Sequence, residues 1–147
     1  MIDTETKLTS AATLEAKREQ IKKERPEKIG VTICCGTGCQ AYGGLKVAEA
    51  FRQQLAEQGM ADKVNVKTTG CHGFCERGPL IVIRPENILY QRAKIEAVPK
   101  IISETLITGK VIDKLLYTMP GTKEKITAEE EVPFYKKQMR LVFGANG

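Results

Sequence analysis

The sequence contains no tryptophan, a single histidine and few other aromatic residues, 4 Tyr and 4 Phe among 147 residues. Any core that the chain buries is therefore aliphatic, built from Ile, Val, Leu and Ala. Long apolar runs are also missing. No window approaches 18 apolar residues, and residues 1–30 hold no apolar segment of the signal-peptide type. We therefore expect a cytoplasmic protein that does not insert into a membrane.

The sequence also lacks a concentrated run of one charge. It has 23 basic and 18 acidic residues, a formal net charge of +5, and the two signs alternate through residues 15–25. A nucleic-acid-binding protein usually presents a concentrated basic face with stacking aromatic residues. We therefore expect no nucleic-acid partner.

Hydrophobic periodicity predicts three regions in the chain. Residues 10–25 have a polar helical pattern that follows Ser10, a possible N-cap, and ends at Pro26. An ordered domain begins at Ile29, where apolar and polar residues alternate as in a half-buried strand. Residues 118–147 are mostly charged and linker-like at first. The predicted regions are a helical extension (1–28), a folded domain (29–117) and a C-terminal linker with the start of another domain (118–147).

Within residues 29–117 the pattern predicts an α/β fold. Strands are expected at 29–33, 64–68, 80–83 and 88–92, and helices at 45–58 and 97–108. The order β-α-β-β-β-α is typical of a small layered domain. We expect a right-handed crossover between the first two strands and a hairpin between the last two.

Four of the five cysteines form two close pairs in glycine-rich loops. Cys34 and Cys39 are spaced C-x4-C, Cys71 and Cys75 are spaced C-x3-C, and each pair follows a predicted strand. In a reducing compartment such pairs indicate metal binding or redox chemistry rather than disulfides. The two loops can converge at one end of a sheet and offer four thiolates to one centre. Cys35 with Cys39 would also be spaced C-x3-C, so spacing alone does not choose between Cys34 and Cys35.

These loops suit an iron–sulfur cluster, because iron in such clusters takes a tetrahedral set of sulfur ligands. Backbone N–H groups directed at the sulfurs stabilise the anionic cluster, and glycine lets the backbone approach closely. Seven of the 13 glycines lie in the two loops: Gly36, Gly38, Gly43, Gly44, Gly70, Gly73 and Gly78. Gly36, Gly38 and Gly73 are candidate tuning residues. Arg77 either places a positive charge beside the cluster, which eases reduction, or is a solvated loop residue.

Other sites are less consistent with the spacing. Zinc knuckles favour two-residue gaps between cysteines, and a thiol–disulfide enzyme needs C-x-x-C, which neither pair has. A Rieske centre needs two histidines, and His72 is expected to be an exposed loop residue. Residues 36–41 match G-x-G-x-x-A, but the acidic residue of a dinucleotide site would be Glu57, at the end of a helix. The adjacent Cys34 and Cys35 are a further redox candidate.

The two loops resemble those of the thioredoxin-like 2Fe–2S ferredoxins. That family includes the small 2Fe–2S subunit of respiratory complex I and the N-terminal domain of flavoprotein subunits in NAD-linked and electron-bifurcating hydrogenases and related formate dehydrogenases. Residues 75–80, Cys-Glu-Arg-Gly-Pro-Leu, are especially similar to the fused domains. The resemblance implies a thioredoxin-like fold over residues 29–117. It also implies one bystander, Cys35, and four ligands of a 2Fe–2S cluster: Cys34, Cys39, Cys71 and Cys75.

A second resemblance lies near the C-terminus. Residues 132–142, Val-Pro-Phe-Tyr-Lys-Lys-Gln-Met-Arg-Leu-Val, are similar to the segment that opens the flavin- and NADH-binding domain of those fused subunits. This implies an FMN- and NADH-binding flavoprotein partner, together with other Fe–S subunits. We expect a one-electron carrier in an NAD(H)-linked oxidoreductase complex that is not an enzyme by itself. The alternative is a cluster-free or zinc-stabilised assembly module of such a complex.

Overall fold

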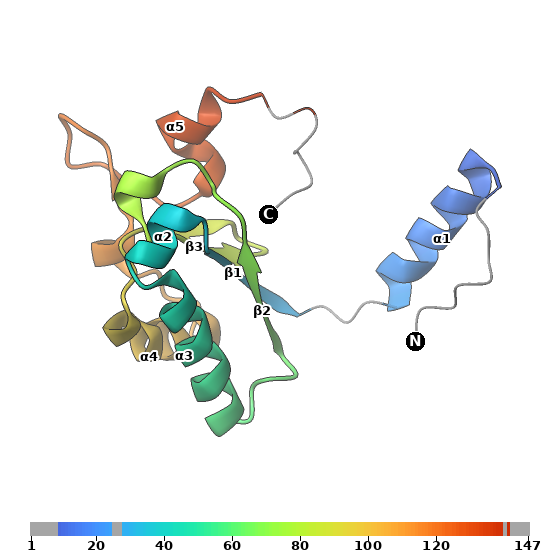
Figure 1. Ribbon diagram of the computed structural model, residues 1–147, viewed down its shortest axis with the longest axis horizontal. Helices are drawn as coiled ribbons and strands as arrows, with labels where there is room; N and C mark the ends of the chain where they lie inside the picture. The colour runs from blue at the N-terminus through green and yellow to red at the C-terminus, as the bar shows by residue number, and fades with distance from the viewer. Residues whose placement is uncertain (1–8, 25–27, 140, 142–147) are drawn as a thin grey trace.

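The computed structural model describes residues 9–24, 28–139 and 141. A four-stranded mixed sheet, ordered β2-β1-β3-β4, forms the centre of the fold (Figure 1). Strand β1 (Ile29–Cys34) is parallel to β2 (Val64–Thr69) and antiparallel to β3 (Ile81–Arg84). Strands β3 and β4 (Ile88–Tyr90) form the expected hairpin. The sheet confirms the β-α-β-β-β-α order expected from the sequence.

Helices cover one face of this sheet (Figure 1). Helix α3 (Gly44–Glu57) buries Val47, Phe51 and Leu55 against the sheet, because these residues lie on one side of the helix. A short helix, α2 (Thr37–Ala41), precedes it where the sequence predicted only a turn. Helix α4 (Val98–Lys100) begins the expected last helix and continues as π-helical turns over Ile101–Ile107. The pattern predicted this helix but not its π form.

The opposite face of the sheet is covered by a segment that the sequence predicted to be a linker. Strands β5 (Tyr117–Thr118) and β6 (Lys125–Ile126) pair, and helix α5 (Pro133–Lys136) follows. We call residues 117–136 the strap. Its buried side chains join a second core with sheet residues: Ile126, Val132 and Tyr135 with Leu80, Val82 and Leu89. The linker interpretation of this part is corrected, because the apolar second face of the sheet needs a cover.

The strap is also attached to the sheet by backbone hydrogen bonds. Leu89 N donates to Thr127 O at 2.8 Å, and Glu129 N donates to Asn87 O at 2.9 Å. Ile88 and Ala128 form an antiparallel bridge. Residues 127–129 therefore continue the sheet beyond β4 and occupy hydrogen-bonding groups that an edge strand leaves open.

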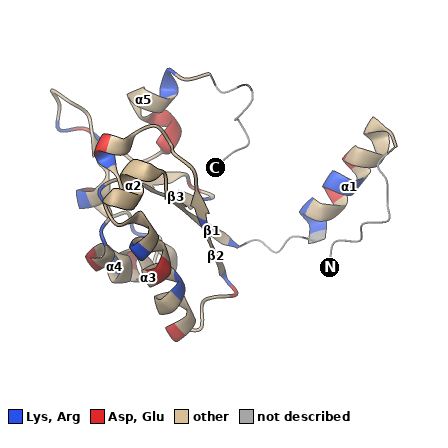
Figure 2. Ribbon diagram, viewed as in Figure 1, with Lys and Arg blue, Asp and Glu red and all other residues tan. Residues whose placement is uncertain are grey.

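Helix α1 (Ala11–Glu24) projects from the rest of the chain (Figure 1). Ser10 is its N-cap, since its hydroxyl accepts from Thr13 N at 3.2 Å. Leu14 and Ile21 are exposed, and charges of both signs alternate along the helix (Figure 2). The helical extension is thus present, while Pro26 lies outside the described residues.

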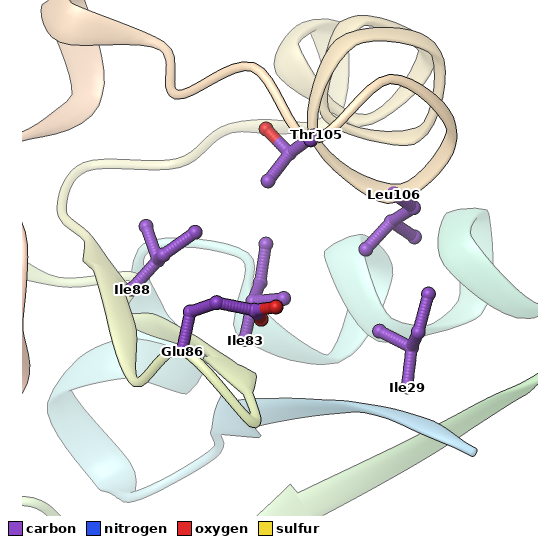
Figure 3. A pocket seen from close by; sticks show the side chains of 7 residues that line it. Ile29, Ile83, Glu86, Ile88, Thr105 and Leu106 are labelled. Carbon is purple, nitrogen blue, oxygen red and sulfur yellow. The ribbon is translucent and has the colours of Figure 1, made fainter. Parts of the chain in front are cut away.

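A small pocket of about 170 Å³ opens at the start of β1 (Figure 3). Ile29, Ile83, Ile88 and Leu106 supply apolar walls, and Glu86 also lines the pocket, with its carboxylate beside Ile83 in the view of Figure 3. Ile29 and Cys34 are the two ends of β1, so this pocket lies at the opposite end of the sheet from the cysteines. Among the described residues no helix is both long enough and apolar enough to cross a bilayer.

Candidate iron–sulfur site

The first cysteine loop, residues 34–39, joins the end of β1 to α2. Cys34 and Cys39 are almost fully buried, at 1% and 0% exposure, in the core between the sheet and the strap. Their thiols interact: burial, together with a hydrogen bond to Cys34, raises the pKa of Cys39 to about 12. Cys34 N also donates to Leu80 O at 3.0 Å, which ties this loop to the beginning of β3.

The second cysteine loop, residues 70–79, joins β2 to β3 and lies nearer the solvent. Cys71 is exposed and Cys75 is half-buried. Their sulfur atoms lie 3.4 Å apart, close enough for one tetrahedral metal to bind both. The hydrogen bond with Cys71, together with burial, raises the pKa of Cys75. Gly73 N donates to Cys71 Sγ at 3.2 Å, a backbone contact of the kind that stabilises a ligand thiolate.

Glycines allow the two loops to touch. A Cβ atom on Gly36 would lie 2.7 Å from Cys71 Cβ and 2.9 Å from Cys71 Cα. A Cβ atom on Gly78 would lie 2.7 Å from Cys39 Sγ, and one on Gly38 would lie 3.1 Å from Cys75 Cβ. Each loop thus approaches a cysteine of the other loop at a glycine, where a larger residue would place a Cβ atom against that cysteine. Of the candidate tuning residues, Gly36, Gly38 and Gly73 all lie against the cysteines.

Cys35 lies apart from this group. Side chains alternate across a strand, so Cys35 follows Val31 and Ile33 onto the face covered by α3. There it packs against the helical core, and burial raises the pKa of its thiol. The structure therefore brings together Cys34, Cys39, Cys71 and Cys75, and directs Cys35 elsewhere.

The arrangement of thiols fits a binuclear cluster. Among the described residues, no three His, Cys, Asp or Glu side chains converge as ligands of one metal ion. The two irons of a 2Fe–2S cluster share four cysteines, two for each iron. Two adjoining thiol pairs are the donor set that such a cluster takes.

Two other residues of the second loop contact side chains outside the cysteine group, and one of them, His72, differs from expectation. His72 is not exposed but 9% accessible, because Thr69 and Glu129 enclose it: Nε2 lies 3.1 Å from Thr69 Oγ1, and Nδ1 donates to Glu129 Oε1 at 3.0 Å. The guanidinium of Arg77 lies over the rings of Phe74 and Tyr117, at 5.9 and 5.5 Å from their centres, and pairs with Glu76. No local sequence signal indicated that Glu129, 57 residues away, would reach His72.

Fold and thiol geometry together define a class, the iron–sulfur proteins built on a small thioredoxin-like domain. The family of thioredoxin-like [2Fe-2S] ferredoxins matches residues 18–106. The chain belongs to this family.

Individual relatives agree with that assignment. A 2Fe-2S ferredoxin of Clostridium pasteurianum is 29% identical over 77 residues, which cover 52% of this chain and 76% of that protein. A putative 2Fe-2S ferredoxin of Priestia megaterium is 29% identical over 91 residues, covering 61% and 71%. The solved structure of a thioredoxin-like [2Fe-2S] ferredoxin from Aquifex aeolicus superposes with a TM-score of 0.59 at 22% identity. That likeness covers 68% of this chain and 99% of the other.

Three expectations are thereby confirmed: the thioredoxin-like fold, the 2Fe–2S cofactor and the role of an electron-carrying ferredoxin. The assignment of individual ligands and the identity of the redox partner stay predictions.

Proposed function

We propose that this ferredoxin relays single electrons to or from a flavin or Fe–S partner in an NAD(H)-linked oxidoreductase complex, with Cys34, Cys39, Cys71 and Cys75 as the cluster ligands. The observation that carries the proposal is the pairing of these thiols at the junction of the two loops. When bound, the cluster accepts and releases one electron at a time. The protein needs no general acid, base or nucleophile for this task.

The residues around the thiols have two tasks in this proposal. The buried first loop keeps water from Cys34 and Cys39, which lowers the local dielectric around their side of the cluster. The second loop places Cys71 at the surface, where a redox partner can approach. The Gly73 N–H stabilises negative charge on the Cys71 sulfur.

The resemblance of residues 132–142 to the opening of a flavin domain supports a flavoprotein partner that binds FMN and NADH. In the structure, α5 begins this segment, and Phe134 lies directly over the second loop. A partner that continues from or docks beside α5 is therefore close to the exposed thiol pair. By this reasoning the hydrogenase, formate dehydrogenase and NADH dehydrogenase types are the candidate host complexes.

The test is analysis of protein purified without oxygen. We expect about two irons and two acid-labile sulfides per chain, no zinc, and a rhombic EPR signal after dithionite reduction. Zinc, or no metal at all, would contradict the relay and leave a docking module. Reduction by NADH should require an added FMN-containing flavoprotein subunit, and reduction without it would contradict the proposed partner.

The two adjacent cysteines give a matched pair of variants for the ligand assignment. Cys35→Ser should keep the visible spectrum and the EPR signal, because Cys35 packs on the helical face of the sheet. Cys34→Ser should lose or alter both. The reverse result would show that Cys35 is the ligand.

A further inference from the structure

The strap lies beyond the residues that match the family. The match ends at residue 106, whereas the strap spans 117–136. Nevertheless it contacts the second cysteine loop at two separate places. The backbone bonds to Asn87 and Leu89 fix the strap against β4, so these contacts come from an anchored segment rather than from a loose tail.

The first contact is the hydrogen bond between His72 and Glu129. His72 follows the proposed ligand Cys71, and the side chains of His72 and Glu129 are only 7% and 15% exposed. Thr69, at the end of β2, lies against the other ring nitrogen at 3.1 Å. The imidazole is therefore held between the sheet and the strap, at the residue between Cys71 and Gly73.

The second contact is aromatic. The rings of Phe74 and Phe134 stack at 4.6 Å with an interplanar angle of 7°. Phe134 also covers Gly73, whose φ of +84° only glycine adopts readily: a Cβ atom there would lie 3.3 Å from the Phe134 ring. Tyr135 meets Phe74 edge-on at 6.0 Å. Phe74 precedes Cys75, so this contact acts on the second ligand of the pair.

We propose that Glu129 and Phe134 are positioning residues for the Cys71–Cys75 half of the cluster site, acting through His72 and Phe74. The two contacts fix the residues between the thiols, at His72 on one side and at Phe74 on the other. This chain thus completes its cluster site with a segment outside the family domain. The inference rests on the proposed function, because it assumes that Cys71 and Cys75 bind the cluster.

The test uses the cluster-loaded chain of residues 1–147 with Glu129→Ala and Phe134→Ala, each beside a matched control. Glu131→Ala removes an exposed carboxylate from the same turn, and Met139→Ala removes an exposed apolar side chain beyond α5. Glu129→Gln keeps an acceptor oxygen and should rescue the site. Four quantities are measured: the rate of iron loss to a chelator, the shape of the EPR and visible circular dichroism spectra, the urea unfolding midpoint, and hydrogen exchange of residues 70–78 and 34–43.

We expect iron loss about tenfold faster in the two test variants, the lower end of the effect that outer-shell partners of metal ligands have. Their spectra should change shape, and exchange should rise in residues 70–78 but not in 34–43. The controls and Glu129→Gln should behave as the parent does. If the test variants only lower the urea midpoint, or raise exchange equally in both segments, the strap has a general structural role and the inference is wrong.

The exchange measurement separates this inference from the proposed function. If the parent binds no cluster, the proposed function fails, and a selective rise in exchange at residues 70–78 still supports positioning by the strap. If the parent holds a cluster whose lifetime and spectra are the same in all variants, the inference fails and the proposed function stands.

Discussion

The two cysteine loops carry the same chemistry in opposite surroundings. Cys34 and Cys39 are enclosed by the core between the sheet and the strap, whereas Cys71 is exposed and Cys75 is half-buried. The first loop is fixed by burial and by a short helix. The second has no regular structure beyond a 3₁₀ turn at Cys75–Arg77 and depends on contacts from the strap.

This difference suggests that the two loops have different roles, the first in the stability of the fold and the second in electron transfer to a partner. Buried thiols contribute to the core and are costly to change. Exposed thiols allow a partner to come within electron-transfer distance, but they need outside support to keep their geometry. In this chain the protected half is enclosed between the sheet and the apolar side chains of the strap. The accessible half is held by two side-chain contacts that the strap makes with the loop, one at His72 and one at Phe74.

The largest effect that we predict is on the buried half. Cys39→Ser should abolish the cluster and destabilise the fold by about 1–3 kcal/mol, because it buries a hydroxyl among apolar side chains. Cys71→Ser should lower cluster content but leave the unfolding midpoint of the cluster-free protein unchanged, because residue 71 is exposed. Iron analysis and urea unfolding of the cluster-free proteins measure the two effects. If both variants destabilised the cluster-free protein equally, the two loops would not differ in their contribution to the stability of the fold.

A smaller effect is expected where the loops touch. Gly36→Ala places a Cβ atom against the backbone of Cys71, although its φ of −61° suits alanine. The cost therefore comes from the contact alone, about 1–3 kcal/mol for an overpacked site, with a lower cluster content. Gly70→Ala is the control, since a Cβ atom there meets nothing within 4 Å. Urea unfolding and iron analysis measure both variants. If Gly36→Ala matched the parent as Gly70→Ala does, the close contact between residue 36 and Cys71 would be contradicted.

The sequence predicted the parts of this site that depend on local pattern. Alternation identified β1 and β2, and the loops after them placed all four cysteines at one end of the sheet. The spacing of the cysteines does not distinguish Cys34 from Cys35. Assigning Cys35 to the helical face of the sheet required the structure of β1 and the residues that follow it.

The strap could not be predicted in the same way. Its four buried apolar residues, Tyr117, Ile126, Val132 and Tyr135, are spaced with neither strand nor helix periodicity. The bond between His72 and Glu129 is a tertiary contact between distant segments, which no local pattern encodes. The features that sequence reasoning missed are thus those that brace the second loop.

The smallest effect concerns charge beside the second loop. Arg77 lies in the same 3₁₀ turn as Cys75, and its guanidinium lies over the rings of Phe74 and Tyr117. A positive charge there stabilises the reduced, more negative cluster, so Arg77→Gln should lower the reduction potential. A partly exposed charge contributes about 0.5 kcal/mol, or roughly 20 mV for one electron.

The control removes an equal charge from the other end of the sheet. Arg84 ends β3 and pairs in register with Gly30, next to the start of β1, so Arg84→Gln should leave the potential unchanged. An EPR-monitored redox titration of both variants measures the difference. If both variants shift the potential equally, the effect is one of net charge, and Arg77 has no particular influence on the exposed half. If only Arg77→Gln shifts it, the second loop is where this ferredoxin sets the energy of the transferred electron.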